Sequence, residues 1–196
     1  MTMHGRNKKE TGWVIWFVGL PGAGKSTYAQ AVYHALQEQG IDVHYLSMDE
    51  KRKDYSPTHR YTPEERDKAY HLFAGEAARI ANQGTNVIMD GTAPRLSMRE
   101  YARRLVPHFA EIYIRCPLQT AMCREESRPE GQVMANLYSK ALERKRTGAH
   151  TEGLGEVIGV DTPFEENPTV ECVIDSDGVS IEKGRDQVLD FLAAWS

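Results

Sequence analysis

The stretch Gly19-Leu20-Pro21-Gly22-Ala23-Gly24-Lys25-Ser26 decides the fold of this chain, because it fills every fixed position of the phosphate-binding loop pattern G-x-x-x-x-G-K-[ST]. In that pattern the glycines let backbone N–H groups curl around phosphate oxygens, the lysine reaches the β- and γ-phosphates, and the serine hydroxyl binds Mg²⁺. An apolar run over residues 13–18 predicts a buried strand entering the loop, and residues 27–39 predict a helix leaving it. The sequence therefore predicts a nucleoside triphosphate site, with residues 22–26 and Thr27 around the phosphates.

The composition limits the class of partner. The chain has 196 residues, which predicts a single domain over 12–196 after a flexible N-terminal arm over 1–11. Its net charge is −4 and its basic residues are interspersed with acidic ones, which argues against binding of a long nucleic acid. The sequence offers neither a signal peptide nor a membrane span, and its three cysteines lack metal-ligand spacing. We expect a cytoplasmic protein with free thiols and a small anionic ligand.

Short apolar runs alternate with longer helical stretches, a pattern that predicts a parallel sheet with crossover helices. We expect strands at 13–18, 43–46, 86–89, 111–114 and 170–174. We expect helices at 27–39, 63–83, 97–105, 118–126, 133–146 and 181–195. The predicted fold is a three-layer α/β/α P-loop NTPase of the nucleotide-kinase type, with a five-stranded parallel sheet.

Residues 140–156 differ in composition from the rest of the chain. They are rich in charge and glycine and show little apolar periodicity beyond their first turns. This predicts a mobile lid at about 139–158, and an ordinary solvated surface loop is the alternative.

Two carboxylates follow predicted strands at the edge where open parallel sheets bind ligands. Asp49 follows the second strand, three residues before Arg52. An acid there can orient or deprotonate an acceptor hydroxyl and help to hold Mg²⁺ through water, while the arginine can bind the acceptor's own phosphate. Asp90 follows the third strand in a D-x-T segment similar to that of 5′-hydroxyl kinases, and is either a ligand of Mg²⁺-bound water or a strand-end cap.

Two further patterns separate the classes of phosphate-loop protein. The base-recognition pattern N-K-x-D of GTPases is missing from the sequence, as is the hydrophobic strand ending in Asp-Glu that motor ATPases use. Both absences favour a kinase.

Several segments resemble the adenylyl-sulfate kinase family, from the phosphate loop to about residue 174. The family's D-G-D-x-x-R falls on residues 47–52 and its G-F-S-x-x-x-R on residues 60–66. Its L-Y-x-K-A reappears at 137–141, and its C-terminal G-I-D-x-P-Y-E signature is similar to residues 159–165. The resemblance implies transfer of a phosphoryl group from MgATP to the 3′-hydroxyl of adenosine 5′-phosphosulfate (APS), a place in sulfate assimilation, and a homodimer.

On the acceptor side, the resemblance implies a role for four residues. Asp49 would be the catalytic acid near the acceptor hydroxyl, and Arg52 and Arg66 would bind the phosphosulfate. Tyr61 would stack on the acceptor base, a role that its flat ring suits.

On the donor side, Lys25 would act on the transferring phosphoryl group, and Ser26 would bind the metal, with Asp90 as the candidate second ligand. Lys140 in the lid would touch the transferring phosphate. Arg128 would pack on the adenine of ATP.

The chain departs from the family pattern mainly at the acceptor site. Family residues fall on different side chains at Ser47, Ala69, His71, Leu72, Ala93 and Val157. The acceptor is therefore either APS or another compound, such as a cytidine diphosphoramidate-like nucleotide, a sugar or another phosphorylated metabolite. A nucleotide-binding module without turnover is the alternative of another class. Asp49 argues against it, because a pure binder has no use for an acid on the acceptor side.

Overall fold

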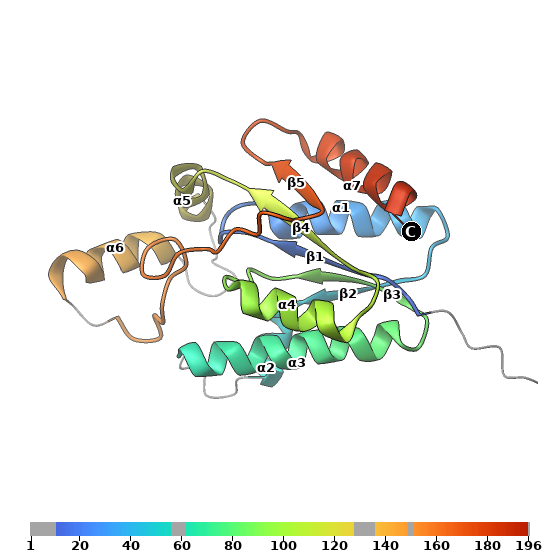
Figure 1. The fold of residues 1–196 in the computed structure, drawn as a ribbon. Helices are drawn as coiled ribbons and strands as arrows, with labels where there is room; N and C mark the ends of the chain where they lie inside the picture. The colour runs from blue at the N-terminus through green and yellow to red at the C-terminus, as the bar shows by residue number, and fades with distance from the viewer. Residues whose placement is uncertain (1–10, 56–61, 128–135, 149–150, 196) are drawn as a thin grey trace, which may run out of the picture.

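The computed structural model of the chain describes residues 11–55, 62–127, 136–148 and 151–195 (Figure 1). Its strands are β1 (Val14–Val18), β2 (Val43–Ser47), β3 (Asn86–Asp90), β4 (Phe109–Arg115) and β5 (Cys172–Asp175). Its helices are α1 (Lys25–Glu38), α2 (Met48–Tyr55), α3 (Pro63–Ala81), α4 (Leu96–Leu105), α5 (Leu118–Glu126), α6 (Leu137–Thr147) and α7 (Ile181–Trp195). No helix within these ranges is long and apolar enough to cross a membrane.

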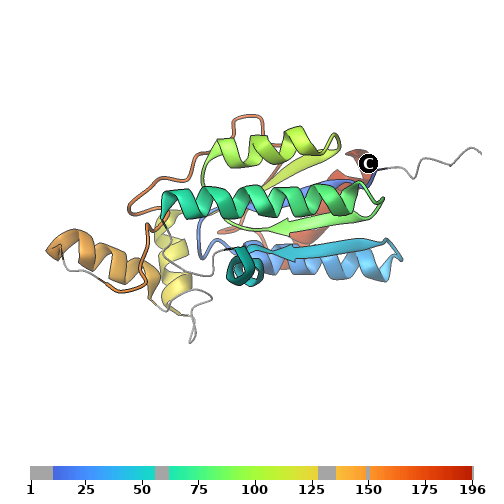
Figure 2. The ribbon, with the colours of Figure 1, turned by 90° about the horizontal axis from the view of Figure 1, so that it is seen from below.

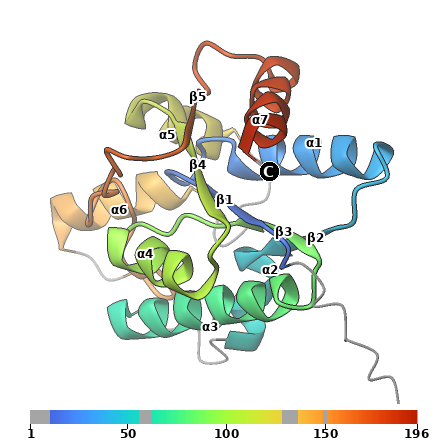
Figure 3. The ribbon, with the colours of Figure 1, turned by 45° about the vertical axis from the view of Figure 1, so that its right-hand side comes forward.

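The five strands form one parallel sheet in the order β2-β3-β1-β4-β5. Helices α1 and α7 cover one face, and α3 and α4 lie side by side on the other (Figures 1, 2 and 3). The central strand β1 is fully buried, and its side chains alternate between the two layers. Ile15 and Phe17 pack with α1 and α7, while Trp16 packs with α3 and α4. The predicted three-layer α/β/α architecture is confirmed.

All of the expected strands and helices are observed, with shifted ends. The structure also contains helix α2, which the sequence analysis did not predict. Its sequence, Met-Asp-Glu-Lys-Arg-Lys-Asp-Tyr, has almost no apolar periodicity. Tertiary contacts hold it instead: Met48 is buried, Lys51 Nζ lies 2.7 Å from Glu76 Oε1, and the Tyr55 hydroxyl also donates to Glu76. Asp49 and Arg52 therefore lie on a helix fastened to α3, and not in a loop.

Helix α6 occupies the first half of the expected lid, and it stands beyond the carboxyl ends of the strands (Figures 1 and 2). The helix predicted over 133–146 is observed over Leu137–Thr147, and residues 133–135 lie outside the described ranges. Tyr138 and Ala141 pack with Leu154 and Val157 in a small apolar cluster, together with Leu118 of α5. The segment 151–158 is thus folded back on α6.

The carboxyl ends of β1, β2 and β3 meet at one edge of the sheet. Asp90 pairs in register with Phe17 of β1 and with Ser47 of β2, so its side chain is placed between the phosphate loop and the start of α2.

The three cysteines are free thiols, as expected.

Candidate active site

The phosphate loop takes a conformation that its glycines permit. Gly22 and Gly24 have φ of 81° and 100°, values that side chains with a Cβ adopt only under strain. A Cβ on Gly22 would lie 2.3 Å from the carbonyl oxygen of Ala121, so the loop also depends on glycine for its approach to α5. Helix α1 begins directly after Gly24 without a side-chain cap, which leaves the N–H groups of its first turn for phosphate oxygens. Lys25 Nζ donates to the carbonyl of Leu20 at 3.0 Å.

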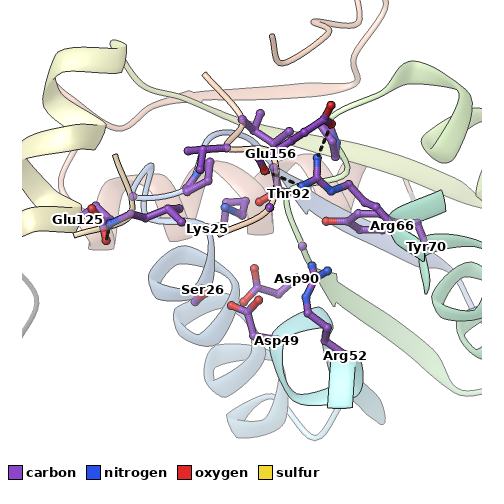
Figure 4. A pocket seen from close by; sticks show the side chains of 18 of the residues that line it. Lys25, Ser26, Asp49, Arg52, Arg66, Tyr70, Asp90, Thr92, Glu125 and Glu156 are labelled. Carbon is purple, nitrogen blue, oxygen red and sulfur yellow. Dashed lines mark hydrogen bonds and ion pairs between the residues drawn. The ribbon is translucent and has the colours of Figure 1, made fainter. Parts of the chain in front are cut away.

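A cleft of about 150 Å³ opens beside this loop (Figure 4). It lies at the carboxyl edge of the sheet, as the strand order predicts. Its lining comes from the phosphate loop, α2, α3, the segment after β3, and the folded-back segment of the lid: Pro21, Gly22, Gly24, Lys25, Ser26, Asp49, Arg52, Arg66, Tyr70, Asp90, Gly91, Thr92, Pro94, Glu125, Leu137, Gly153, Leu154, Gly155, Glu156, Val157 and Ile158.

Asp90 is a buried carboxylate in the lining of this cleft, with 5% of its surface exposed. It accepts a hydrogen bond from the Tyr45 hydroxyl at 2.9 Å, and the Ser26 side chain lines the same cleft. Burial raises the pKa of Asp90 above its ordinary value, and the nearby Lys25 ammonium opposes this shift. Asp90 therefore lies beside the phosphate loop, and its role as a ligand of Mg²⁺-bound water stays a prediction.

Helix α2 brings a second carboxylate to the same place. Asp49 faces the cleft near Asp90 and Ser26, and Arg52 follows one turn later (Figure 4). Because Lys51 and Tyr55 hold the outer side of α2 to Glu76, the inner side has a fixed orientation toward the phosphate loop.

Arg66 enters the cleft from the first turn of α3. Thr62 caps this helix by accepting the Glu65 N–H at 3.2 Å, and Pro63 occupies its first position, so the sequence itself fixes where the turn begins. The Arg66 side chain is 9% exposed, and its Nη2 donates to the backbone carbonyl of Glu156 at 2.7 Å. Burial lowers the pKa of Arg66 below its ordinary value, which nevertheless leaves a guanidinium charged at neutral pH.

The other expected site residues lie elsewhere or outside the described ranges. Ala23 is buried behind the loop and Thr27 is exposed on α1, and neither lines the cleft. Lys140 is half-buried on α6, also away from the lining. Tyr61 and Arg128 fall outside the described residues, so their roles stay predictions.

Of the positions that depart from the family pattern, Val157 lines the cleft. Ala69 and Ala93 are fully buried, whereas Leu72 is 44% exposed. Leu72 therefore does not account for a changed acceptor contact.

The sequence motifs do not identify two of the residues that line the cleft, Tyr70 and Glu125. Tyr70 follows Arg66 at the i, i+4 spacing of one helix face, a signal that was available in the predicted helix 63–83. Glu125 accepts the backbone N–H of Leu137 at 2.9 Å and that of Tyr138 at 3.5 Å. No local pattern predicts that contact, because it joins two different helices.

Comparisons with known proteins point to one family. The family model described as adenylylsulphate kinase matches residues 11–175. A protein of Archaeoglobus fulgidus named "Probable adenylyl-sulfate kinase" is 35% identical over 164 residues, which cover 84% of this chain and 96% of the relative. An adenylyl-sulfate kinase of Deinococcus deserti is 31% identical over 190 residues, covering 95% of this chain and 94% of the relative.

A solved structure shares the fold. The APS kinase CysC of Mycobacterium tuberculosis, in complex with AMPPNP and APS, superposes with a TM-score of 0.77 at 24% identity, covering 93% of this chain and 98% of that one. The predicted P-loop kinase fold is thereby confirmed.

Proposed function

The chain belongs to the adenylylsulphate kinase family, and on that premise we propose that it transfers the γ-phosphoryl group of ATP to the 3′-hydroxyl of APS. One observation carries the assignment: a single cleft brings Lys25 and Ser26 of the phosphate loop together with Asp49 and, on its far side, Arg66. Phosphoryl transfer needs this division into a donor side and an acceptor side. The Mycobacterium tuberculosis relative, whose structure holds AMPPNP and APS together, supports the same pairing of substrates.

On the donor side, the phosphate loop and the first turn of α1 would cradle the phosphates of ATP. Lys25 would exchange its contact with the Leu20 carbonyl for the β- and γ-phosphate oxygens. Ser26 and Asp90 offer a hydroxyl and a carboxylate, the oxygen donors that Mg²⁺ prefers, and would hold the ion directly and through its water shell. When bound, Mg²⁺ would neutralise negative charge on the phosphate oxygens.

On the acceptor side, Asp49 would orient the 3′-hydroxyl and accept its proton as the new bond to phosphorus forms. Arg52 and Arg66 would bind the phosphosulfate through their guanidinium groups. Lys140 on the lid, Tyr61 and Arg128 complete the proposed set, with the roles that the family resemblance gives them. A homodimer and a cytoplasmic location stay predictions.

The same kinase chemistry on another acceptor is the second candidate. Val157 lines the cleft at a position where the family pattern has an aromatic side chain. Loss of a stacking ring removes about 0.5 to 1.5 kcal/mol of attraction for a base, which favours a smaller or non-aromatic acceptor.

The experiment compares acceptors with the purified chain and MgATP. We expect ADP and 3′-phosphorylated APS in equal amounts, and Lys25→Ala should lower kcat about 10³-fold or more, because it removes the cation that stabilises charge on the transferring group. Circular dichroism checks that the variant folds. ADP release with a sugar or a cytidine nucleotide, and none with APS, would show that APS is not the acceptor and that the other compound is. ATP binding without turnover on any acceptor would instead favour the non-catalytic module.

A further inference from the structure

Tyr70 occupies the acceptor side of the cleft, one helical turn after Arg66. Its side chain is 2% exposed and yet lines the cleft. The ring packs against Trp16 with 5.9 Å between ring centroids, which fixes the direction of the phenol. Figure 4 shows the hydroxyl pointing inward between the guanidinium groups of Arg66 and Arg52.

The Tyr70 hydroxyl uses only part of its hydrogen-bonding capacity. Its oxygen accepts the backbone N–H of Ala93 at 3.0 Å. A phenol also has one O–H to donate, and none of the residues in the described ranges accepts it. A buried donor without an acceptor is destabilising, so this O–H is suited to a ligand atom in the cleft.

The charges around this donor indicate what kind of ligand atom it meets. Arg52 and Arg66 both attract negative charge at the Tyr70 oxygen. Burial outweighs that attraction and raises the pKa of Tyr70, so the phenol keeps its proton and remains a donor at neutral pH. The two guanidinium groups, which only donate, and the O–H of Tyr70 therefore face one place, which fits an oxyanion with several oxygens and disfavours a cation.

We propose that Tyr70 is an additional acceptor-binding residue, whose O–H donates to the sulfate or phosphate oxygens of the acceptor between Arg52 and Arg66. This inference rests on the proposed function for the identity of the acceptor. The two guanidinium groups supply the charge, and the phenol, held by Trp16 and Ala93, supplies direction.

Tyr70→Phe tests the proposal, because it keeps the ring and removes only the hydroxyl. We expect the KM for APS to rise about 10-fold or more, since the variant loses a hydrogen bond to a charged oxygen, with kcat and the KM for ATP within about twofold. Tyr113→Phe is the matched control, because Tyr113 donates to Glu166 at 3.0 Å outside the cleft. Its kinetic constants should be unchanged.

A purely structural role of Tyr70 gives a different result. If the hydroxyl only held Ala93, its loss would lower the melting temperature and disturb the segment after Asp90. The KM for ATP or kcat would then change without a selective rise in the KM for APS, and the proposal would be overturned.

Calorimetric titration of the ADP-bound chain separates this inference from the proposed function. Wild-type chain that binds inorganic sulfate but neither binds nor phosphorylates APS would refute the proposed acceptor, and weaker sulfate binding by Tyr70→Phe would still support the anion contact. If the wild type and Tyr70→Phe bind APS equally tightly, and also bind sulfate equally tightly, the proposed contact is overturned. It is also overturned if the wild type binds neither anion.

Discussion

Replacement of Glu125 by alanine should loosen helix α6 while leaving the sheet intact. Glu125 lies at the end of α5, is 6% exposed, and accepts the backbone N–H groups of Leu137 and Tyr138 in the first turn of α6. The residue before that turn, Asn136, has a left-handed backbone and makes no capping contact with its own side chain. Within the described part of the chain, Glu125 therefore caps the N-terminus of α6 in place of Asn136.

The size of the effect follows from the geometry. Replacing a capping side chain with alanine costs about 0.5 to 2 kcal/mol. The acceptor is a carboxylate that is buried at the positive end of the helix dipole, and its bond to the Leu137 N–H has an ordinary length of 2.9 Å, which places the cost near the upper end. We expect about 2 kcal/mol, or about a 30-fold increase in the equilibrium constant for opening of α6.

Amide hydrogen exchange measures this opening directly. Amides of residues 137–147 should exchange about 30-fold faster in Glu125→Ala, while amides of β1 and β3 keep their rates. Because the Tyr138 hydroxyl donates to the carbonyl of Pro21 at 2.8 Å, the KM for ATP should rise as well.

The neighbouring residue provides the control. Glu126 is exposed, and its carboxylate accepts a hydrogen bond from the Ser139 hydroxyl on the surface. Exposed contacts of this kind contribute little, so Glu126→Ala should leave exchange within about twofold of wild type. Equal acceleration by both variants, or unchanged exchange in Glu125→Ala, would refute the capping role.

Two further predictions concern the reaction. Asp49→Asn should lower kcat about 10²-fold or more, because general-base catalysis contributes about that factor, and it should leave the KM for ATP unchanged. Steady-state kinetics at saturating APS measures the effect. An unchanged kcat would show that Asp49 takes no part in the reaction. Arg52→Ala and Arg66→Ala should each raise the KM for the acceptor about 10-fold or more, since a cation that binds the acceptor's anion acts in the ground state and the transition state alike. A rise in the KM for ATP instead would place these arginines on the donor side.

Local sequence is sufficient where sterics or periodicity act within a few residues. The phosphate loop is predictable because only glycine takes the positive φ of Gly22 and Gly24 without strain. The start of α3 is predictable because Thr62 and Pro63 satisfy and pre-set its first turn. Strand β1 is recognisable from its unbroken apolar run, as expected of a strand covered on both faces.

Helix α2 and the position of Asp90 required the tertiary structure. Helix α2 has a charged sequence and depends on contacts with Glu76, more than twenty residues away. Asp90 lies beside Ser47 because of the register of β3 against β2, and no single segment of sequence encodes that register.

The sequence by itself determined the nucleotide end of the site, because that end is one continuous loop whose residues act through their own backbone. The tertiary structure decided the proposed acceptor end, where Arg52, Arg66, Tyr70 and Glu156 come together from three separate segments. Their directions are set by packing: Tyr70 is aimed by Trp16 and Ala93, and Arg66 by the folded-back lid segment. Contacts between residues far apart in the chain depend on how the layers close on one another, and local propensity carries no information about that closure.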